Sequence, residues 1–119
     1  MIGIDLIKID RMERFMEKFG DKGLSRFLSQ NEIRLVKNHK TAAGFWAAKE
    51  ACSKALGTGI GKECSFHDII LSKTSKRAPL LTLSQHLRDS YHISDTSLSI
   101  THDGEYAIAV VAMEDNKLS

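Results

Sequence analysis

The segment 45–57 constrains the fold most strongly, because it has the periodicity of a helix but almost no polar face. At about 100° per residue, Phe45, Cys52 and Leu56 form one apolar stripe, and alanines at 43, 47, 48, 51 and 55 fill the other sides. Gly57 is the residue type that commonly ends a helix in a left-handed conformation. We therefore predict a helix that ends at Gly57 and is buried on all sides.

Three charged residues, Lys49, Glu50 and Lys54, lie on this predicted helix. Lysine and glutamate are almost never fully buried without a partner, because moving a charge out of water is costly. Glu50 and Lys54 have the spacing of an ordinary surface ion pair, which is worth about 0.2–0.5 kcal/mol on an exposed helix. Because the helix offers no other polar surface, we expect few structural duties for these charges and a ligand among their partners.

The composition is that of one ordinary globular domain. The chain has 119 residues, of which 42% are hydrophobic and 27% are charged, and we predict a single domain over residues 1–119. A net charge of only +2 gives no reason to expect nucleic-acid binding. Since no apolar run approaches the roughly 18 residues of a membrane span, no membrane partner is expected either.

The two cysteines, Cys52 and Cys64, lack the spacing of a metal site and the context of a disulfide-rich domain. We predict that both are reduced, buried thiols. No secretory leader precedes the first folded segment, so we expect a cytoplasmic chain that is not processed.

The first seven residues alternate in the manner of a strand. Asp5 lies on the face opposite to Ile2, Ile4 and Leu6. It is either a functional carboxylate within a strand or an ordinary edge residue that caps nearby backbone.

Two helices are expected before the alanine-rich one. A capping-box pattern at 10–13 predicts a helix over 11–19, where apolar residues continue with helical spacing. A second capping box at 29–32 predicts another helix, which leads through 39–40 into the third. Both signals place helices in the first half of the chain.

The second half favours strands. Short strands are predicted at 66–71 and 80–83, with a polar loop at 73–77 and a short helix at 83–91. The runs 97–101 and 105–113 flank Asp103-Gly104, whose backbone suits a tight hairpin turn. Helices followed mainly by strands indicate an α+β fold.

Each remaining polar motif has an ordinary interpretation. The glycine-rich stretch 57–61 follows a helix, whereas phosphate-binding loops precede one, so a helix cap followed by a tight loop is its default. His102 is either an exposed histidine near a turn or, with Ser99 and Thr101, part of an anion-binding group. A basic series near the N-terminus is either a solvated face or a docking surface for an acidic partner. This series comprises Arg11, Arg14, Lys18, Lys22 and Arg26.

Three blocks of sequence follow one another over nearly the whole chain. They read GIDL at 3–6, WAAKEACSKALGTGIG at 46–61, and SITH at 99–102 followed by Tyr106-Ala107. In this order and spacing they resemble the short bacterial 4′-phosphopantetheinyl transferases, the holo-[acyl-carrier-protein] synthase family. The resemblance implies helices packed on a mainly antiparallel sheet, and a homotrimer with active sites between subunits.

The same resemblance implies an enzyme of fatty acid biosynthesis that moves the 4′-phosphopantetheine arm of coenzyme A onto a serine of apo-acyl carrier protein. Adenosine 3′,5′-bisphosphate is released. Asp5 and Glu50 match the family's metal positions, where Mg²⁺ suits carboxylate ligands and a charged leaving group. Lys54 would contact a phosphate, and either Glu50 or a metal-bound water would activate the serine.

The resemblance also implies which residues bind coenzyme A and which bind acyl carrier protein. Gly57, Thr101 and His102 would hold the nucleotide end of coenzyme A. The basic series would meet the acidic recognition helix of acyl carrier protein, with Arg11 and Arg26 aligned best.

Two positions depart from the family pattern. Phe45 stands where the family usually has arginine, and the loop 76–78 reads Lys-Arg-Ala where relatives more often read Gly-Lys-Pro. The alternative function is a non-catalytic module that binds a phosphorylated ligand or an acidic protein.

Overall fold

The computed structural model describes residues 1–116 of the chain. In chain order the elements are β1 (Ile2–Lys8), α1 (Ile9–Leu24), α2 (Gln30–Ile33), α3 (His39–Leu56), the 3-10 helix η1 (Phe66–Asp68), β2 (Ile69–Lys73), β3 (Pro79–Leu83), α4 (Gln85–Tyr91), β4 (Ile93–Asp103) and β5 (Tyr106–Asp115). None of the described helices combines the length and hydropathy needed to cross a membrane.

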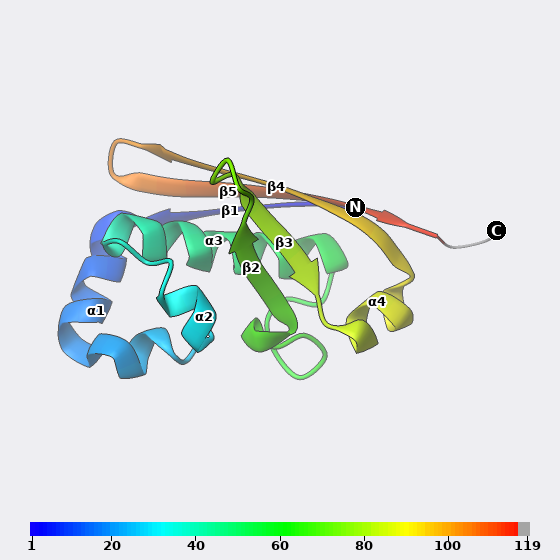
Figure 1. Ribbon diagram of the computed structural model, residues 1–119, viewed down its shortest axis with the longest axis horizontal. Helices are drawn as coiled ribbons and strands as arrows, with labels where there is room; N and C mark the ends of the chain where they lie inside the picture. The colour runs from blue at the N-terminus through cyan, green and yellow to red at the C-terminus, as the bar shows by residue number, and fades with distance from the viewer. Residues whose placement is uncertain (117–119) are drawn as a thin grey trace.

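Two antiparallel sheets carry the helices. β1, β5 and β4 form a three-stranded sheet in that order, and β2 pairs with β3 in a separate hairpin. In Figure 1, α3 runs along one face of the larger sheet, with α1 at one end of the molecule and α4 at the other. This arrangement confirms the predicted α+β fold with helices packed on an antiparallel sheet.

The contact between β1 and α3 depends on a glycine. A Cβ atom at Gly3 would collide with the carbonyl oxygen of Ala51 and lie 2.6 Å from the backbone nitrogen of Ala55. These neighbours are helix backbone, which cannot swing aside as a side chain can. Gly3 and the alanines of α3 thus let the strand lie directly on the helix, with the face that carries Asp5 turned toward it.

The two cysteines are free and buried, as predicted. Burial raises the pKa of Cys52 to about 12 and that of Cys64 to about 11. Both thiols therefore stay protonated near neutral pH and behave as small apolar residues.

The first capping box is absent, whereas the second is confirmed. α1 begins at Ile9, earlier than predicted, and its N-cap is Lys8 without a side-chain hydrogen bond. The helix then reaches Leu24 through a break at Gly20, whose φ is 56°. At the second site the backbone N–H of Ser29 donates to Glu32 at 2.7 Å, and that of Glu32 donates back at 3.3 Å.

The second predicted helix is shorter than expected. α2 ends at Ile33, and a separate N-cap at Asn38 accepts the backbone N–H groups of Lys40 and Thr41 to start α3. At the other end of α3, Gly57 adopts a φ of 84°, which confirms the predicted stop. The local caps therefore divide α2 from α3.

The second half follows the prediction with one change of type and one shift. The first three residues of the predicted strand 66–71 form η1, and only then does β2 begin. β3 and α4 are found where strand and helix were expected. In the last hairpin Asp103 pairs with Tyr106, so the turn is formed by Gly104 and Glu105 rather than 103–104. Gly104 has a φ of 58°, which a tight turn of this kind requires.

Replacing Gly3 with alanine tests the contact between β1 and α3. Gly3→Ala is expected to lower the free energy of unfolding by about 3 kcal/mol, at the upper end of the usual cost of overpacking. Urea denaturation measures the change. Gly61→Ala is the matched control, because a Cβ atom there meets nothing within 4 Å. Equal stability of the two variants would contradict the close approach.

Candidate active site

Asp5 and Lys54 meet where β1 crosses the last turn of α3. The Lys54 Nζ donates to Asp5 Oδ1 at 2.9 Å and to the carbonyl oxygen of Ile4 at 3.2 Å. The Asp5 side chain is 14% exposed, whereas that of Lys54 is 52% exposed. The carboxylate is therefore fixed in the sheet, and the ammonium reaches it from solvent.

Glu50 lies in the electrostatic field of both residues. Burial raises the pKa of the Glu50 carboxyl above its ordinary value of 4.5, the charge of Asp5 raises it further, and Lys54 lowers it. Glu50 precedes Lys54 by one helical turn, but the carboxylate within ion-pair distance of Lys54 is Asp5. Asp5, Glu50 and Lys54 therefore interact electrostatically, but the ion pair joins Lys54 to Asp5 rather than to Glu50.

The donor set suits a hard divalent cation. The Asp5 carboxylate of β1 accepts the Lys54 ammonium, and the charges of both residues affect the pKa of Glu50 on α3. The described residues contain no group of three or more His, Cys, Asp or Glu side chains that could hold a metal by themselves. Asp5 and Glu50 would therefore supply only part of a coordination shell, and Mg²⁺ commonly takes the remainder from substrate phosphates and water.

A pocket of about 190 Å³ lies beside the first turns of α3, and His102 is part of its wall. The His102 Nε2 lies 2.9 Å from the carbonyl oxygen of Lys40, at the start of α3. A Cβ atom at Gly44 would lie 3.0 Å from the Cγ2 atom of Ile100, so the glycine leaves room for the Ile100 side chain. The lining residues are Thr41, Gly44, Phe45, Lys73, Pro79, Ile100 and His102.

Both departures from the family pattern fall at this pocket. Phe45 lines it directly, and Pro79, which follows the loop 76–78, lines it as well. Lys73 is a pocket residue that sequence reasoning did not identify. Burial lowers the pKa of Lys73 from 10.5, and so do the nearby charges of Arg77 and Lys37, so positive charge gathers beside the pocket. No local pattern marked Lys73, because it reaches the pocket only through the pairing of β2 with β3.

Thr101 does not join His102 in this pocket. Side chains alternate along a strand, and Ile100 and His102 occupy the face of β4 that lines the pocket. Thr101 is exposed on the opposite face, paired with Ile108 of β5. β5 also separates β4 from β1, so His102 and Asp5 belong to opposite edges of the sheet.

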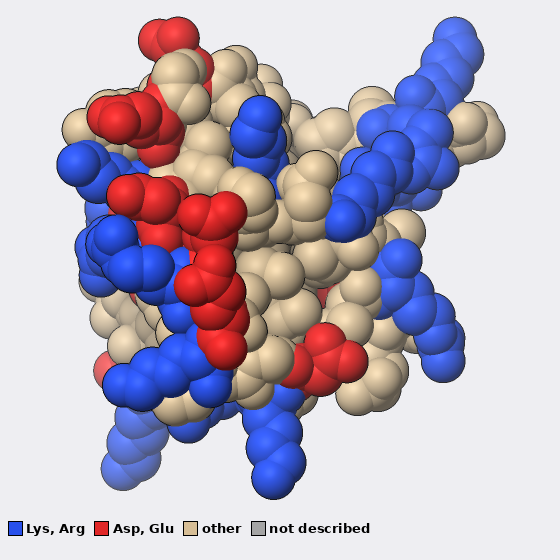
Figure 2. Space-filling model, turned by 90° about the vertical axis from the view of Figure 1, so that its left-hand side faces the viewer, with Lys and Arg blue, Asp and Glu red and all other residues tan. Residues whose placement is uncertain are grey.

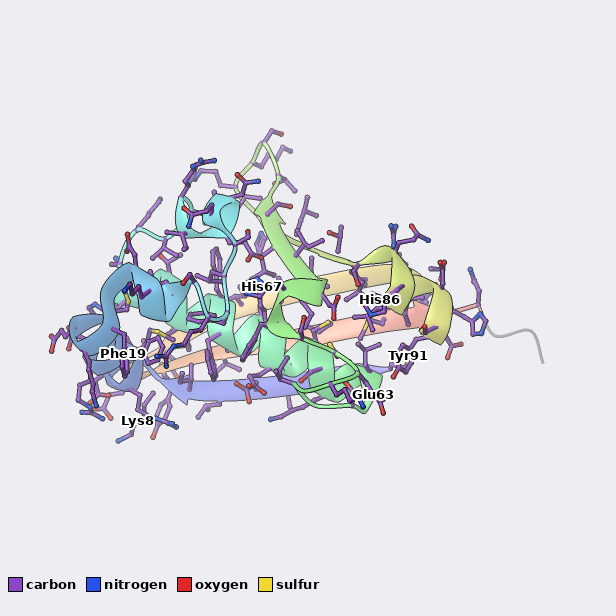
Figure 3. All side chains as sticks on the ribbon, turned by 90° about the horizontal axis from the view of Figure 1, so that it is seen from below. Lys8, Phe19, Glu63, His67, His86 and Tyr91 are labelled. Atoms are coloured by element: carbon purple, nitrogen blue, oxygen red, sulfur yellow. The ribbon has the colours of Figure 1, made fainter. Side chains whose placement is uncertain are left out.

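The glycine-rich stretch forms a helix cap and a tight loop, which is the default interpretation of its sequence. The carbonyl oxygen of Ser53 accepts the backbone N–H groups of Gly57, Thr58 and Gly59 at 3.1, 3.2 and 3.2 Å. Farther along this loop, Glu63 accepts the hydroxyl of Tyr91 from α4 at 3.1 Å, and the two side chains lie together in Figure 3. The loop is thus anchored at both of its ends.

Comparison with known proteins identifies the family. A model of the 4′-phosphopantetheinyl transferase superfamily matches residues 1–111. The chain belongs to this superfamily. It is 65% identical over 114 residues to a holo-[acyl-carrier-protein] synthase of Sulfurimonas denitrificans, covering 96% of this chain and 94% of that protein. A protein of the same name from Wolinella succinogenes is 60% identical over 117 residues, covering 98% and 99%.

A solved structure from the same superfamily has a very similar fold. The crystal structure of the Helicobacter pylori holo-[acyl-carrier-protein] synthase in complex with coenzyme A superimposes with a TM-score of 0.93. The two chains share 52% sequence identity, and the match covers 96% of this chain and all of that one. The resemblance noted from three sequence blocks is therefore confirmed over nearly the full length.

Within this phosphopantetheinyl transferase chain, the expectation that Lys49 has few structural duties is wrong. The Lys49 side chain is fully buried, and its Nζ donates to Phe27 O at 2.7 Å, Glu32 Oε1 at 2.9 Å and Phe66 O at 3.0 Å. Glu32 is 2% exposed and also accepts the backbone N–H of Leu71 at 2.7 Å. Lys49 thus joins α3 to three other segments inside the protein.

The predicted burial of α3 on all sides is also incorrect in part. Lys54 is half exposed and Glu50 is partly exposed, so one edge of the last turns faces solvent beside β1. The three charges divide between two roles. Lys49 is internal and structural, whereas Glu50 and Lys54 lie at the edge of the helix that faces solvent.

The basic series lies at the α1 end of the molecule. Figure 2 looks onto this end, where lysine and arginine side chains gather beside a band of acidic ones. Arg14 forms an ion pair with Asp10 at 3.4 Å. Arg26 and Lys18 lie over the ring of Phe19, at 4.6 and 5.3 Å from its centre. The cations thus surround an apolar ring at the protein surface.

Removing Lys49 tests its structural role. Lys49→Met is expected to lower the free energy of unfolding by about 3–5 kcal/mol, because Glu32 is left buried with an uncompensated charge. The double variant with Glu32→Gln removes that charge and is expected to recover much of the loss. Urea denaturation of both proteins distinguishes the cases. A Lys49→Met protein as stable as the wild type would contradict the assignment.

Proposed function

We propose that this chain transfers 4′-phosphopantetheine from coenzyme A to a serine of apo-acyl carrier protein and releases adenosine 3′,5′-bisphosphate. The observation that carries the proposal is the convergence of Asp5, Glu50 and Lys54 beside β1. The relatives named above are holo-[acyl-carrier-protein] synthases, and the solved Helicobacter pylori structure holds coenzyme A. The chemistry of the three residues suits such a transfer.

In this reaction the serine hydroxyl attacks the β-phosphorus of the coenzyme A diphosphate. The new P–O bond forms as the bond to the bridging oxygen breaks, and negative charge develops on the leaving phosphate. Mg²⁺, held by Asp5 and Glu50, would stabilise that charge as a Lewis acid. The Lys54 ammonium would donate hydrogen bonds to phosphate oxygens in the same region. Glu50 would accept the serine proton, directly or through water, and its raised pKa would make its carboxylate a stronger base.

The pocket beside His102 is proposed to hold the nucleotide end of coenzyme A. Phe45, Pro79 and Ile100 supply apolar walls for a base, and Lys73 supplies positive charge for a phosphate. Because Phe45 replaces the family's arginine, the positive charge at this pocket would come from Lys73 of β2 instead. His102 would act through the nitrogen that its contact with Lys40 leaves free.

We propose that the active sites lie between subunits of a homotrimer. Within one chain, His102 and Asp5 belong to opposite edges of the sheet, so a single ligand is better served by one edge from each of two protomers. The outer face of the same sheet is apolar along β1, where Ile2, Ile4 and Leu6 are 74%, 58% and 53% exposed. An exposed apolar patch of this kind is typical of an interface between protein subunits. Thr101, which lies on this face, would reach the neighbouring subunit's site.

Acyl carrier protein is proposed to dock at the α1 end. Arg11 borders an apolar hollow of about 100 Å³ that is lined by Ile7, Met12, Phe15 and Trp46. A cation beside an apolar hollow suits a partner helix that carries acidic and apolar side chains. The remaining basic residues, Arg14, Lys18, Lys22 and Arg26, would contribute to attraction over longer distances.

Transfer is tested with the purified chain, coenzyme A, Mg²⁺ and apo-acyl carrier protein. Mass spectrometry is expected to show the phosphopantetheine adduct on the carrier. Glu50→Gln is expected to abolish turnover without loss of stability, because burial and Asp5 already disfavour the charged form of this group. Its folded pKa is raised, so its contribution to stability is present at low pH and is lost as pH rises through that value, whereas glutamine has no such loss.

The control is Asp89→Asn, which removes an exposed carboxylate on α4, outside the larger sheet, and is expected to retain full turnover. A fully active Glu50→Gln protein would remove the role given to Glu50. Absence of the adduct with a carrier that another transferase modifies would favour the non-catalytic binding module.

Assembly is tested by a charge on the outer sheet face. Ile4→Glu is expected to convert the trimer to monomers, measured by light scattering after size-exclusion chromatography, and to abolish turnover with it. Ile70→Glu is the control, because Ile70 of β2 is also exposed, at 45%, but lies outside this sheet. A wild-type chain that is monomeric and active would contradict the proposal.

A further inference from the structure

The Lys54 ammonium contacts Asp5, the carboxylate that the proposed function assigns to a divalent metal ion. Lys54 is the hydrogen-bond partner that the described residues provide for the Asp5 side chain, which is only 14% exposed. Glu50 lies close enough for its charge to be felt there as well. A lysine ammonium thus balances the same carboxylate pair that the proposed function assigns to a divalent ion.

The ammonium is held by more than Asp5. It also donates to the carbonyl oxygen of Ile4 at 3.2 Å, and it lies in the last turn of α3, where the helix dipole favours positive charge. A divalent ion that approaches Asp5 would meet the repulsion of this charge and would compete for the same oxygen. The Lys54 ammonium and a divalent ion therefore compete for the Asp5 carboxylate.

Of the two side chains in this contact, Lys54 can move away more easily than Asp5. The lysine side chain is half exposed and has a flexible stem, so it can move into solvent. Asp5 is fixed in β1, which Gly3 holds against α3. What Lys54 needs in order to move is another anion, and a diphosphate offers several oxygens to its three N–H donors.

We propose that Lys54 is a resident counter-ion that couples metal binding to diphosphate binding. In the free protein it occupies Asp5 and weakens the hold on a divalent ion. When a diphosphate binds, Lys54 turns to the phosphate oxygens and leaves Asp5 to the metal. The proposal rests on the proposed function, since it takes Asp5 and Glu50 as the metal-binding pair, and it adds an order to the assembly of the site.

The test measures metal affinity rather than turnover. Binding of Mn²⁺ to the full chain is followed by electron paramagnetic resonance of the free ion, with and without coenzyme A. Without coenzyme A, Lys54→Met is expected to bind Mn²⁺ about fivefold more tightly than the wild type, the scale expected for loss of a partly exposed competing ion pair. The gain in Mn²⁺ affinity on adding coenzyme A is expected to be smaller in this variant than in the wild type.

Two further variants separate competition at Asp5 from a general effect of charge. Lys54→Arg keeps a cation beside Asp5 and is expected to bind Mn²⁺ no more tightly than the wild type. Lys62→Met removes an exposed lysine from the loop after α3, and with it one positive charge, and is also expected to leave the affinity unchanged. Circular dichroism confirms that each variant is folded.

The proposal is overturned if Lys54→Met binds Mn²⁺ no more tightly than the wild type, or if Lys62→Met gains as much affinity. If the wild-type protein transfers phosphopantetheine, either of these results overturns only the counter-ion role of Lys54. Failure of the wild type to transfer overturns the proposed function, whatever the metal affinities are.

Discussion

Strand β1 lies in direct contact with helix α3, and this contact positions the residues of the candidate site. Gly3 has no side chain, and the facing turns of α3 carry alanines, so the strand lies against helix backbone. That contact orients the Asp5 side chain toward the last turns of the helix, where Glu50 and Lys54 lie. A larger residue at position 3 would separate the strand from the helix and so would separate the two carboxylates.

Helix α3 uses its charged residues for two different purposes. Lys49 points into the protein, where it bonds Glu32 and two backbone carbonyl oxygens and is fully withdrawn from water. Its neighbour Glu50 points to the edge beside β1. Because consecutive helical residues lie about 100° apart, a helix can support the fold with one residue and the reaction with the next. The rotation of α3 that buries Lys49 is the same rotation that turns Glu50 toward Asp5.

The larger sheet divides the candidate site into two parts. Asp5 lies on one edge strand and His102 on the other, with β5 between them. The inner face of the sheet packs on α3, whereas the outer face is apolar along β1 and polar along β4, where Thr101 lies. Association through the outer face would bury the exposed apolar residues of β1. The proposed trimer would bring the β1 edge of one subunit close to the β4 edge of another.

Most of the elements, and the family, could be predicted from local sequence patterns. The capping box of Ser29 and Glu32, the helix stop at Gly57 and the positive φ at Gly104 depend on near neighbours in the chain, which a sequence displays directly. The blocks around Asp5, Glu50 and His102 likewise indicated a phosphopantetheinyl transferase. The capping box expected at Asp10 failed for the opposite reason, since β1 runs directly into α1 and Lys8 takes the cap position.

Which charges meet depends on the packing of distant segments against one another. The pairing of Lys49 with Glu32, of Lys54 with Asp5, and the arrival of Lys73 at the pocket each join segments that are distant in the sequence. No periodicity records such contacts, because they follow from how strands and helices pack rather than from local backbone preference. The sequence therefore showed that three charges on one helix required partners, and the packing of the chain decided which partner each one found.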